Sequence, residues 1–244
     1  MERGDAMEAG FMAFDALHWR WLIGLMLGII VLTVVYARAT QAWRLRIKRL
    51  LAYSILIGEV VKLFVVWQLG KSLLYYLPIH LCGFAIVLLM LHVYRPTALI
   101  NEILFSLTLP GALIALIFPG WTAEPVMGFI HIHSFIYHGI ITVYPLLLLA
   151  SGELRPNWRQ LWKVAIFLAL IIPFVYSFNA YSGTNYMFLN APIANSPLML
   201  IYETFGANGY IAGLVMVAVV VWLLQYSLYG LLAKARAGQG QTAV

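Results

Sequence analysis

The chain has 244 residues, of which 63% are hydrophobic and 10% are charged, and its mean hydropathy is +0.90. A soluble domain carries about 25% charged residues, so this composition excludes an ordinary soluble protein and predicts an all-α membrane protein. The net charge of +6 does not indicate nucleic-acid binding, because the basic residues gather at the ends of apolar segments. A single cysteine, Cys82, excludes an internal disulfide.

Residues 1–18 precede the first apolar segment and are acidic. The carboxylates are those of Glu2, Asp5, Glu8 and Asp15. Because the basic n-region of a secretory signal peptide is missing, we expect a short extracytoplasmic N-terminal segment here. We expect His18, at the end of this segment, to lie outside the helical bundle.

Seven apolar segments follow, most of them long enough to cross a bilayer as helices. They cover residues 19–36, 50–69, 75–94, 98–118, 126–149, 164–178 and 210–232. We therefore expect a single bundle of about seven transmembrane helices over residues 19–232.

Two prolines predict local features of these helices. Pro78 is expected in the first turn of the third helix, which would place His80 and Cys82 in its first two turns. Pro110, followed by Gly111, predicts a kink in the middle of the fourth helix.

The basic residues indicate an orientation. They are Arg38, Arg44, Arg46, Lys48 and Arg49 after the first segment, Arg155, Arg159 and Lys163 after the fifth, and Lys234 and Arg236 after the seventh. Cytoplasmic loops carry an excess of Lys and Arg, so we expect loops 37–49 and 151–163 and a tail of residues 233–244 in the cytoplasm, with the N-terminus outside. Loop 37–49 can also be interpreted as a patch that binds anionic lipid.

Residues 179–208 form the longest predicted loop. The loop is rich in Asn, Gly, Pro and aromatic residues, and Glu203 is its one charged residue. Such a long uncharged loop suits a lid or a re-entrant cover on the outer face better than a free linker.

Polar side chains inside the apolar segments are the candidate functional residues, since such groups are costly in lipid. At a rise of 1.5 Å per residue, Cys82 lies about 10 Å and Glu59 about 12 Å below the outer ends of their helices. On the fifth segment, His131, Ser134 and His138 share one helix face. We therefore expect these groups to converge in the outer half of the bilayer.

Each candidate also has a structural interpretation. A lone cysteine in a membrane helix is often a small core residue. Glu59 and Lys62 are three residues apart and can neutralise each other. Histidines such as His92 and His133 can serve only to bond neighbouring helices. A metal site formed by His131, His133 and His138 is a further possibility, although the spacing of these histidines matches no zinc motif.

A cysteine and a histidine together can support nucleophilic catalysis. The thiolate is the reactive form, and in apolar surroundings an adjacent base must take the thiol proton. A histidine within hydrogen-bond reach can do this, and a carboxylate can orient that histidine. His80 is two residues from Cys82, so the two would point to different sides of a regular helix.

Four short motifs carry a resemblance to a known family. They occur in the order G-E-V-V-K-L-F-V-V-W, L-P-I-H-L-C, F-I-Y-H-G-I-I and G-T-N-Y-M-F-L. With them the chain resembles, from the second helix to the seventh, the YwaF-like bacterial membrane proteins, which are similar to the vertebrate transmembrane protein 164 family of phospholipid acyltransferases. The resemblance implies a nucleophile at Cys82, a histidine at His138 and a glutamate at Glu59, and it places the family's Asn-Tyr pair at Asn185 and Tyr186.

The sequence is therefore interpreted as an intramembrane acyltransferase or lipid hydrolase. We expect Cys82 to attack a phospholipid acyl ester, His138 to act as base and acid, and Glu59 to orient or polarise. The residues expected to bind substrate are His80, His131, Ser134, Asn185 and Tyr186. The alternative is a small-solute transporter or a lipid-binding membrane module that uses the same polar cluster. No cofactor motif is visible, the expected partner is membrane phospholipid rather than nucleic acid, and the resemblance implies a multi-pass protein of the bacterial plasma membrane.

Overall fold

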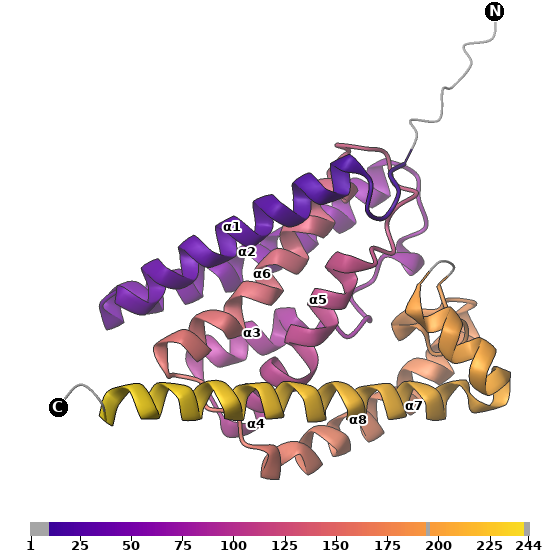
Figure 1. Cartoon of the computed structure of the whole chain (residues 1–244). Helices are drawn as coiled ribbons and strands as arrows, with labels where there is room; N and C mark the ends of the chain where they lie inside the picture. Colours follow the sequence, from indigo (N-terminus) through magenta and orange to yellow (C-terminus); the bar gives the residue numbers. More distant parts are fainter. Residues whose placement is uncertain (1–9, 194–195, 242–244) are drawn as a thin grey trace, which may run out of the picture. The chain divides into compact units, whose positions relative to one another are not determined.

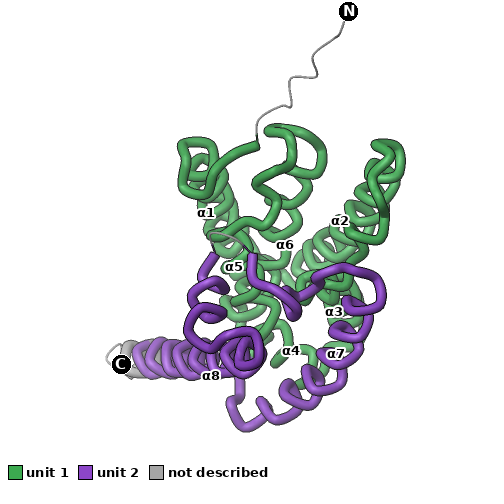
Figure 2. Tube along the Cα trace, turned by 90° about the vertical axis from the view of Figure 1, so that its right-hand side faces the viewer, with its two compact units in different colours: residues 1–154 green, residues 155–244 purple. Residues whose placement is uncertain are grey.

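The structure is a computed structural model that describes residues 10–193 and 196–241, and helices form the regular secondary structure of these ranges. The chain divides into two compact units, residues 1–154 and residues 155–244 (Figure 2). Six helices within the described ranges are long and apolar enough to cross a membrane, and the third predicted span corresponds to a shorter apolar helix. The prediction of an all-α membrane protein is therefore confirmed.

The bounds of the elements differ from the predicted segments at several ends. The first unit contains α1 (Ala16–Arg38), α2 (Gln41–Gln68), η1 (Leu73–Tyr75), α3 (Phe84–Tyr94), α4 (Ala98–Ile103), the π-helical η2 (Leu104–Thr108), α5 (Leu109–Ile117) and α6 (Phe129–Ser151). The second unit contains η3 (Trp158–Gln160), α7 (Leu161–Ser182), η4 (Tyr186–Phe188) and α8 (Pro197–Gln241).

Helix α6 is the centre of the first unit. It packs against α1, α2 and α5, with α1 and α2 running alongside it (Figure 1). Its side chains Ile141, Tyr144 and Leu147 are fully buried. At Gly139, a Cβ would lie 2.8 Å from Leu25 Cδ2, so the glycine allows α1 to approach α6 closely.

The connection between α1 and α2 consists only of Ala39 and Thr40. The predicted loop 37–49 is therefore wrong in extent, because the basic residues from Arg44 onward lie in the first turns of α2. Thr40 caps α2, with its Oγ1 accepting a hydrogen bond from the Trp43 backbone N–H at 3.5 Å. Lys and Arg are good helix formers, so a run of charge ends the apolar segment without ending the helix.

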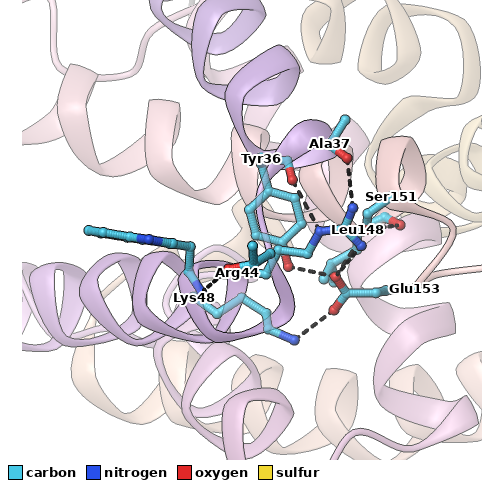
Figure 3. Close-up of polar contacts among 9 residues, drawn as sticks. Tyr36, Ala37, Arg44, Lys48, Leu148, Ser151 and Glu153 are labelled. Atoms are coloured by element: carbon cyan, nitrogen blue, oxygen red, sulfur yellow. Dashed lines mark hydrogen bonds and ion pairs between the residues drawn. The ribbon is translucent and has the colours of Figure 1, made fainter.

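The carboxylate of Glu153, just after α6, joins the ends of α1, α2 and α6 (Figure 3). It accepts hydrogen bonds from Tyr36 Oη at 2.9 Å, Lys48 Nζ at 2.6 Å and Ser151 Oγ at 3.1 Å. The neighbouring Arg44 guanidinium donates to the backbone oxygens of Tyr36 and Ala37, which are among the last carbonyls of α1. This cluster holds helix ends together.

An irregularity is present in the fourth span, as Pro110 predicts. Before the proline, η2 is a π-turn in which the Leu109 N–H bonds the oxygen of Leu104. Pro110 lacks an N–H and its ring collides with the carbonyl four residues earlier, so the regular ladder cannot continue there. Ser106 Oγ compensates in part by donating to the Glu102 oxygen at 2.6 Å.

The start of the third span differs from the prediction. Residues 76–83 form consecutive turns, and helix α3 begins only at Phe84. His80 and Cys82 therefore lie in a non-helical segment that leads into α3, and the expectation of a helix beginning near Pro78 is wrong.

Residues 10–15 fold back over the first unit. The Phe11 N–H donates to the oxygen of Thr122 at 3.0 Å, and the Phe11 ring is buried against Phe135. His18 is fully buried, and its Nε2–H donates to the Leu116 oxygen at 2.8 Å. The expectation that His18 lies outside the bundle is wrong, because the N-terminal segment covers it.

The second unit shortens the predicted loop 179–208. Helix α7 continues to Ser182, and α8 begins at Pro197 with a break at Gly206, where φ is 66° and ψ is 176°. Asn179, near the end of α7, holds the shortened loop: its Oδ1 accepts a hydrogen bond from the Tyr186 N–H at 2.8 Å, and its Nδ2 donates to the Tyr186 oxygen at 2.9 Å. Helix α8 runs to Gln241, and residues 1–9 and 242–244 of the predicted terminal segments lie outside the described residues.

Candidate functional site

Polar residues of α2, the turn of residues 76–83 and α6 lie near one another in the first unit. We call this group the α2–α6 polar cluster, and its members are Glu59, Lys62, His80, Cys82, His133, Tyr137 and His138.

The turn that carries Cys82 is held by a close backbone approach. The Gly83 N–H donates to the His80 oxygen at 2.7 Å, and a Cβ on Gly83 would lie only 2.1 Å from the Pro78 oxygen. Any side chain at position 83 would collide with this backbone atom. The chain therefore turns sharply before α3, and Cys82 in this turn is a free cysteine.

Tyr137 links this turn to α6. Its hydroxyl donates to the backbone oxygen of Cys82 at 3.0 Å, and the same oxygen accepts from the Ala85 N–H at 3.1 Å. The Tyr137 ring is buried and stacks on His133, with centroids 5.3 Å apart. Since His138 is the next residue along α6, the cysteine and the predicted base belong to directly bonded segments.

The hydrogen bond of His138 decides its tautomer. Nδ1 lies 2.8 Å from the backbone oxygen of Ser134. A carbonyl oxygen can only accept, so Nδ1 carries the proton and Nε2 of the neutral ring keeps a lone pair. Trp121 covers one face of the His138 imidazole: the two rings stack with centroids 4.9 Å apart and an interplanar angle of 14°. His138 is thus oriented with Nε2 as the basic nitrogen.

Glu59 and Lys62 form an ion pair on α2, with 2.6 Å between Lys62 Nζ and Glu59 Oε1. Glu59 is only 5% exposed, so the carboxylate faces protein as the sequence predicts. The Lys62 charge acts on His80, His133 and His138, and the Glu59 charge acts on Tyr137. The two charges of the pair therefore neutralise each other and lie within electrostatic range of the candidate base.

His133 and His80 complete the cluster. His133 lies over Gly58 of α2, where a Cβ would be 3.5 Å from Nε2. His80 lies within electrostatic range of His138. His80 of the turn and His133 of α6 therefore both lie within electrostatic range of the candidate base.

Lys71, Tyr76 and Glu124 form a separate hydrogen-bonded group outside the membrane-spanning helices, which we call the Lys71–Glu124 clasp. Lys71 Nζ is 2.6 Å from Glu124 Oε2, and Tyr76 Oη donates to the other carboxylate oxygen at 2.7 Å. Burial lowers the pKa of Lys71, but its hydrogen bonds to Glu124 and Tyr76 outweigh this and raise the pKa overall. The clasp ties the segment before the Cys82 turn to the loop that carries Trp121.

The remaining predicted site residues lie elsewhere. His131 is fully buried, and its Nε2 accepts a hydrogen bond from Trp21 Nε1 at 2.9 Å. Ser134 contributes its backbone oxygen to His138. In the second unit, Asn185 Oδ1 accepts from the Asn190 N–H at 3.1 Å, and Tyr186 is buried within the loop.

The structure gives no support to the metal interpretation. Within residues 10–193 and 196–241, no three His, Cys, Asp or Glu side chains gather closely enough to hold a metal ion. The expectation that His92 bonds a neighbouring helix is confirmed, because its Nδ1 lies 3.0 Å from the hydroxyl of Tyr144 on α6.

Sequence reasoning missed Tyr137 and Trp121. Tyr137 stands beside His138 in the F-I-Y-H motif, which was a usable signal. Trp121 follows Pro119-Gly120 in a loop, and nothing local predicts that a loop tryptophan stacks on a helix histidine.

A model of the TMEM164 family matches residues 13–226 of the chain. Comparison with curated proteins and with solved structures finds no match.

Proposed function

The chain belongs to the TMEM164 family and is a multi-pass membrane protein, and we propose that it is an intramembrane lipid acyltransferase or hydrolase that uses Cys82 and His138. The observation that carries the proposal is the bond between Tyr137 and Cys82, which ties the cysteine's turn to the residue before the candidate base. The tautomer of His138 supports it, because Nε2 is left as the proton acceptor.

The proposed reaction begins with an acyl ester of a membrane phospholipid, which we place in the outer leaflet. His138 Nε2 takes the thiol proton of Cys82, and Sγ attacks the ester carbonyl carbon, so that a C–S bond forms and the π electrons move to the carbonyl oxygen. When the oxyanion collapses, the ester C–O bond breaks and the lysolipid oxygen receives the proton from His138. A thioester on Cys82 remains.

The second half of the reaction regenerates the free thiol of Cys82. A hydroxyl of a lysolipid, or water in a hydrolase, gives its proton to His138 and attacks the thioester carbon. The C–S bond breaks, and the Cys82 thiolate recovers the proton. Glu59, neutralised by Lys62, sets the local field, and His80 is the proposed oxyanion donor from the same turn as Cys82.

The substrate-binding roles expected for His131 and Ser134 stay predictions, since His131 is fully buried against Trp21. The roles assigned to Asn185 and Tyr186 stay predictions. The orientation of the termini is likewise a proposal, tested by the labelling experiment in the Discussion.

The test is to incubate the purified protein in lipid with a phospholipid that bears a labelled acyl chain. Mass spectrometry should find a thioester on the peptide that contains Cys82, and the label should pass to an added lysolipid. Cys82→Ala, Cys82→Ser and His138→Gln should be slower by about 10²-fold or more, the usual worth of an acid–base group.

The variants should still fold, because the Tyr137 bond goes to the backbone oxygen of Cys82 and survives the loss of the thiol. Cys82→Ala should cost on the order of 1 kcal/mol of unfolding free energy. His92→Gln is the matched control, since it changes a buried histidine bonded to Tyr144 and not to the cluster. If no thioester forms while lipid binding or transport survives in Cys82→Ala, the protein is a binding module or transporter instead.

A further inference from the structure

A partly buried tryptophan beside the candidate base has an unused hydrogen-bond donor. Within residues 10–193 and 196–241, Trp121 Nε1 finds no hydrogen-bond partner, although the atom is buried. An indole N–H can only donate, and a buried tryptophan usually finds an acceptor. Leaving this donor unpaired costs free energy, so its retention requires an explanation.

The position of Trp121 is strongly determined. Its ring stacks on His138 at 4.9 Å and meets Phe135 edge-on at 5.2 Å. Its backbone oxygen accepts from the Glu124 N–H at 3.1 Å, and Glu124 is fixed in turn by Lys71. The indole is therefore not free to turn its N–H toward another group.

The direction of the donor follows from the stack. With an interplanar angle of 14°, the indole plane runs nearly parallel to the imidazole, and the N–H lies in that plane. The N–H therefore points along the face of the imidazole rather than at it. The described residues supply no acceptor for this N–H, and an acceptor that approached it would lie beside the His138 ring.

We propose that Trp121 Nε1–H donates a hydrogen bond to the carbonyl oxygen of the acyl ester, and to the oxyanion that forms when Cys82 attacks. This inference rests on the proposed acyl transfer. The step it stabilises moves the π electrons of the carbonyl onto its oxygen while the thiol proton passes to His138 Nε2. Trp121 is then a catalytic donor that acts where negative charge develops.

Two variants separate the donor from the ring. Trp121→Phe keeps an aromatic ring against His138 and deletes the N–H, whereas Trp121→His keeps an aromatic ring with an N–H. Trp67→Phe is the matched control, since Trp67 is 60% exposed on α2. Gel filtration and thermal melting in detergent establish that each variant is folded.

The first measurement is the rate of Cys82 thioester formation in one turnover at saturating labelled phospholipid. Trp121→Phe should be slower by about 10²-fold, the typical effect of removing one oxyanion donor, with an unchanged lipid concentration at half-maximal rate. Trp121→His should recover part of the loss, and Trp67→Phe should match the wild type.

The second measurement does not depend on turnover. A long-chain alkyl trifluoromethyl ketone adds reversibly to a thiol and gives a tetrahedral adduct, whose dissociation constant can be followed by fluorine NMR. Trp121→Phe should weaken the adduct by about the same factor as it slows acylation, because both contain the oxyanion.

The outcomes are distinct. If the wild type forms the thioester and Trp121→Phe forms it equally fast, the donor role is wrong and the acyl-transfer proposal stands. Equal loss in Trp121→Phe and Trp121→His also overturns the donor role, since the N–H then contributes nothing. If the wild type forms neither thioester nor ketone adduct, the acyl-transfer proposal falls, and the donor role falls with it.

Discussion

The hydroxyl of Tyr137 lies 3.0 Å from the backbone oxygen of Cys82 and donates a hydrogen bond to it. The two residues come from α6 and from the turn before α3. Because this bond goes to the backbone, it positions the whole turn and not only the thiol.

Replacing Tyr137 with phenylalanine should therefore affect activity more than stability. One lost hydrogen bond typically costs about 0.5–1.5 kcal/mol, and the Cys82 oxygen keeps its bond from the Ala85 N–H. Loss of precise placement should slow thioester formation by about 10- to 100-fold. The control is Tyr144→Phe. Tyr144 lies on α6 like Tyr137, and the variant loses a comparable hydrogen bond, to His92 of α3. Equal acylation rates in the two variants would show that the Tyr137 bond is only structural.

Gly83→Ala should be strongly destabilising. The added Cβ would lie 2.1 Å from the Pro78 oxygen, a backbone atom that can yield only if the turn changes. We expect a loss of at least about 1–3 kcal/mol, measured as folded yield and melting temperature in detergent. The matched control is Gly28→Ala on α1, where the Cβ meets nothing within 4 Å. A Gly83→Ala protein that melts like Gly28→Ala would mean that the turn accommodates a Cβ without cost.

The Glu59–Lys62 pair predicts a non-additive double mutant. Glu59→Gln alone leaves the Lys62 charge unpaired in a buried place and should cost about 3–5 kcal/mol, whereas adding Lys62→Met should recover most of this loss. Folded yield of the two single variants and the double variant measures the coupling. If Glu59→Gln and the double variant fold normally and lose activity equally, Glu59 contributes to the reaction or to binding.

The stability of the first unit should depend on pH through Glu153. Burial raises the pKa of this carboxyl, but hydrogen bonds from Lys48 and Tyr36 lower it further, so the pKa is below its ordinary value of 4.5. A lowered pKa means that the ionised carboxylate stabilises the fold at pH values above the unfolded pKa. This contribution is lost as the pH falls through the folded pKa.

The measurement compares melting temperatures of the wild type and Glu153→Gln over a range of about pH 7 to pH 3. The difference between the two should be largest near neutral pH and should shrink on acidification. A difference that stays constant with pH would show that the ionisation of Glu153 does not contribute.

The orientation can be tested by labelling on a Cys82→Ala background. Single cysteines at Ala39 and Arg155 report the predicted cytoplasmic connections, and one at Ala191 reports the predicted outer loop. An impermeant maleimide added to intact cells should label position 191 and spare positions 39 and 155 until the cells are opened. The reverse pattern would invert the bundle.

Much of this protein follows from the sequence by itself. The apolar segments predict membrane helices because a lipid-embedded backbone must satisfy its own hydrogen bonds, and six such helices with a shorter seventh are present in the described ranges. The spacing of Glu59 and Lys62 places them on one face, and Pro110 predicts the irregularity found at η2. These are local properties, set by neighbours within one or two helical turns.

The tertiary structure decided the rest. The turn at residues 76–83 is not visible in an apolar run, because its position depends on the hydrogen bond from Tyr137 of α6 to the Cys82 oxygen as well as on the close contact of Gly83 with Pro78. His18 is buried by a segment that folds back from the N-terminus, and Trp121 meets His138 across a loop. Hydropathy and periodicity describe the chain in one dimension. Which side chains of different elements meet depends on how closely the helices and turns pack in three dimensions.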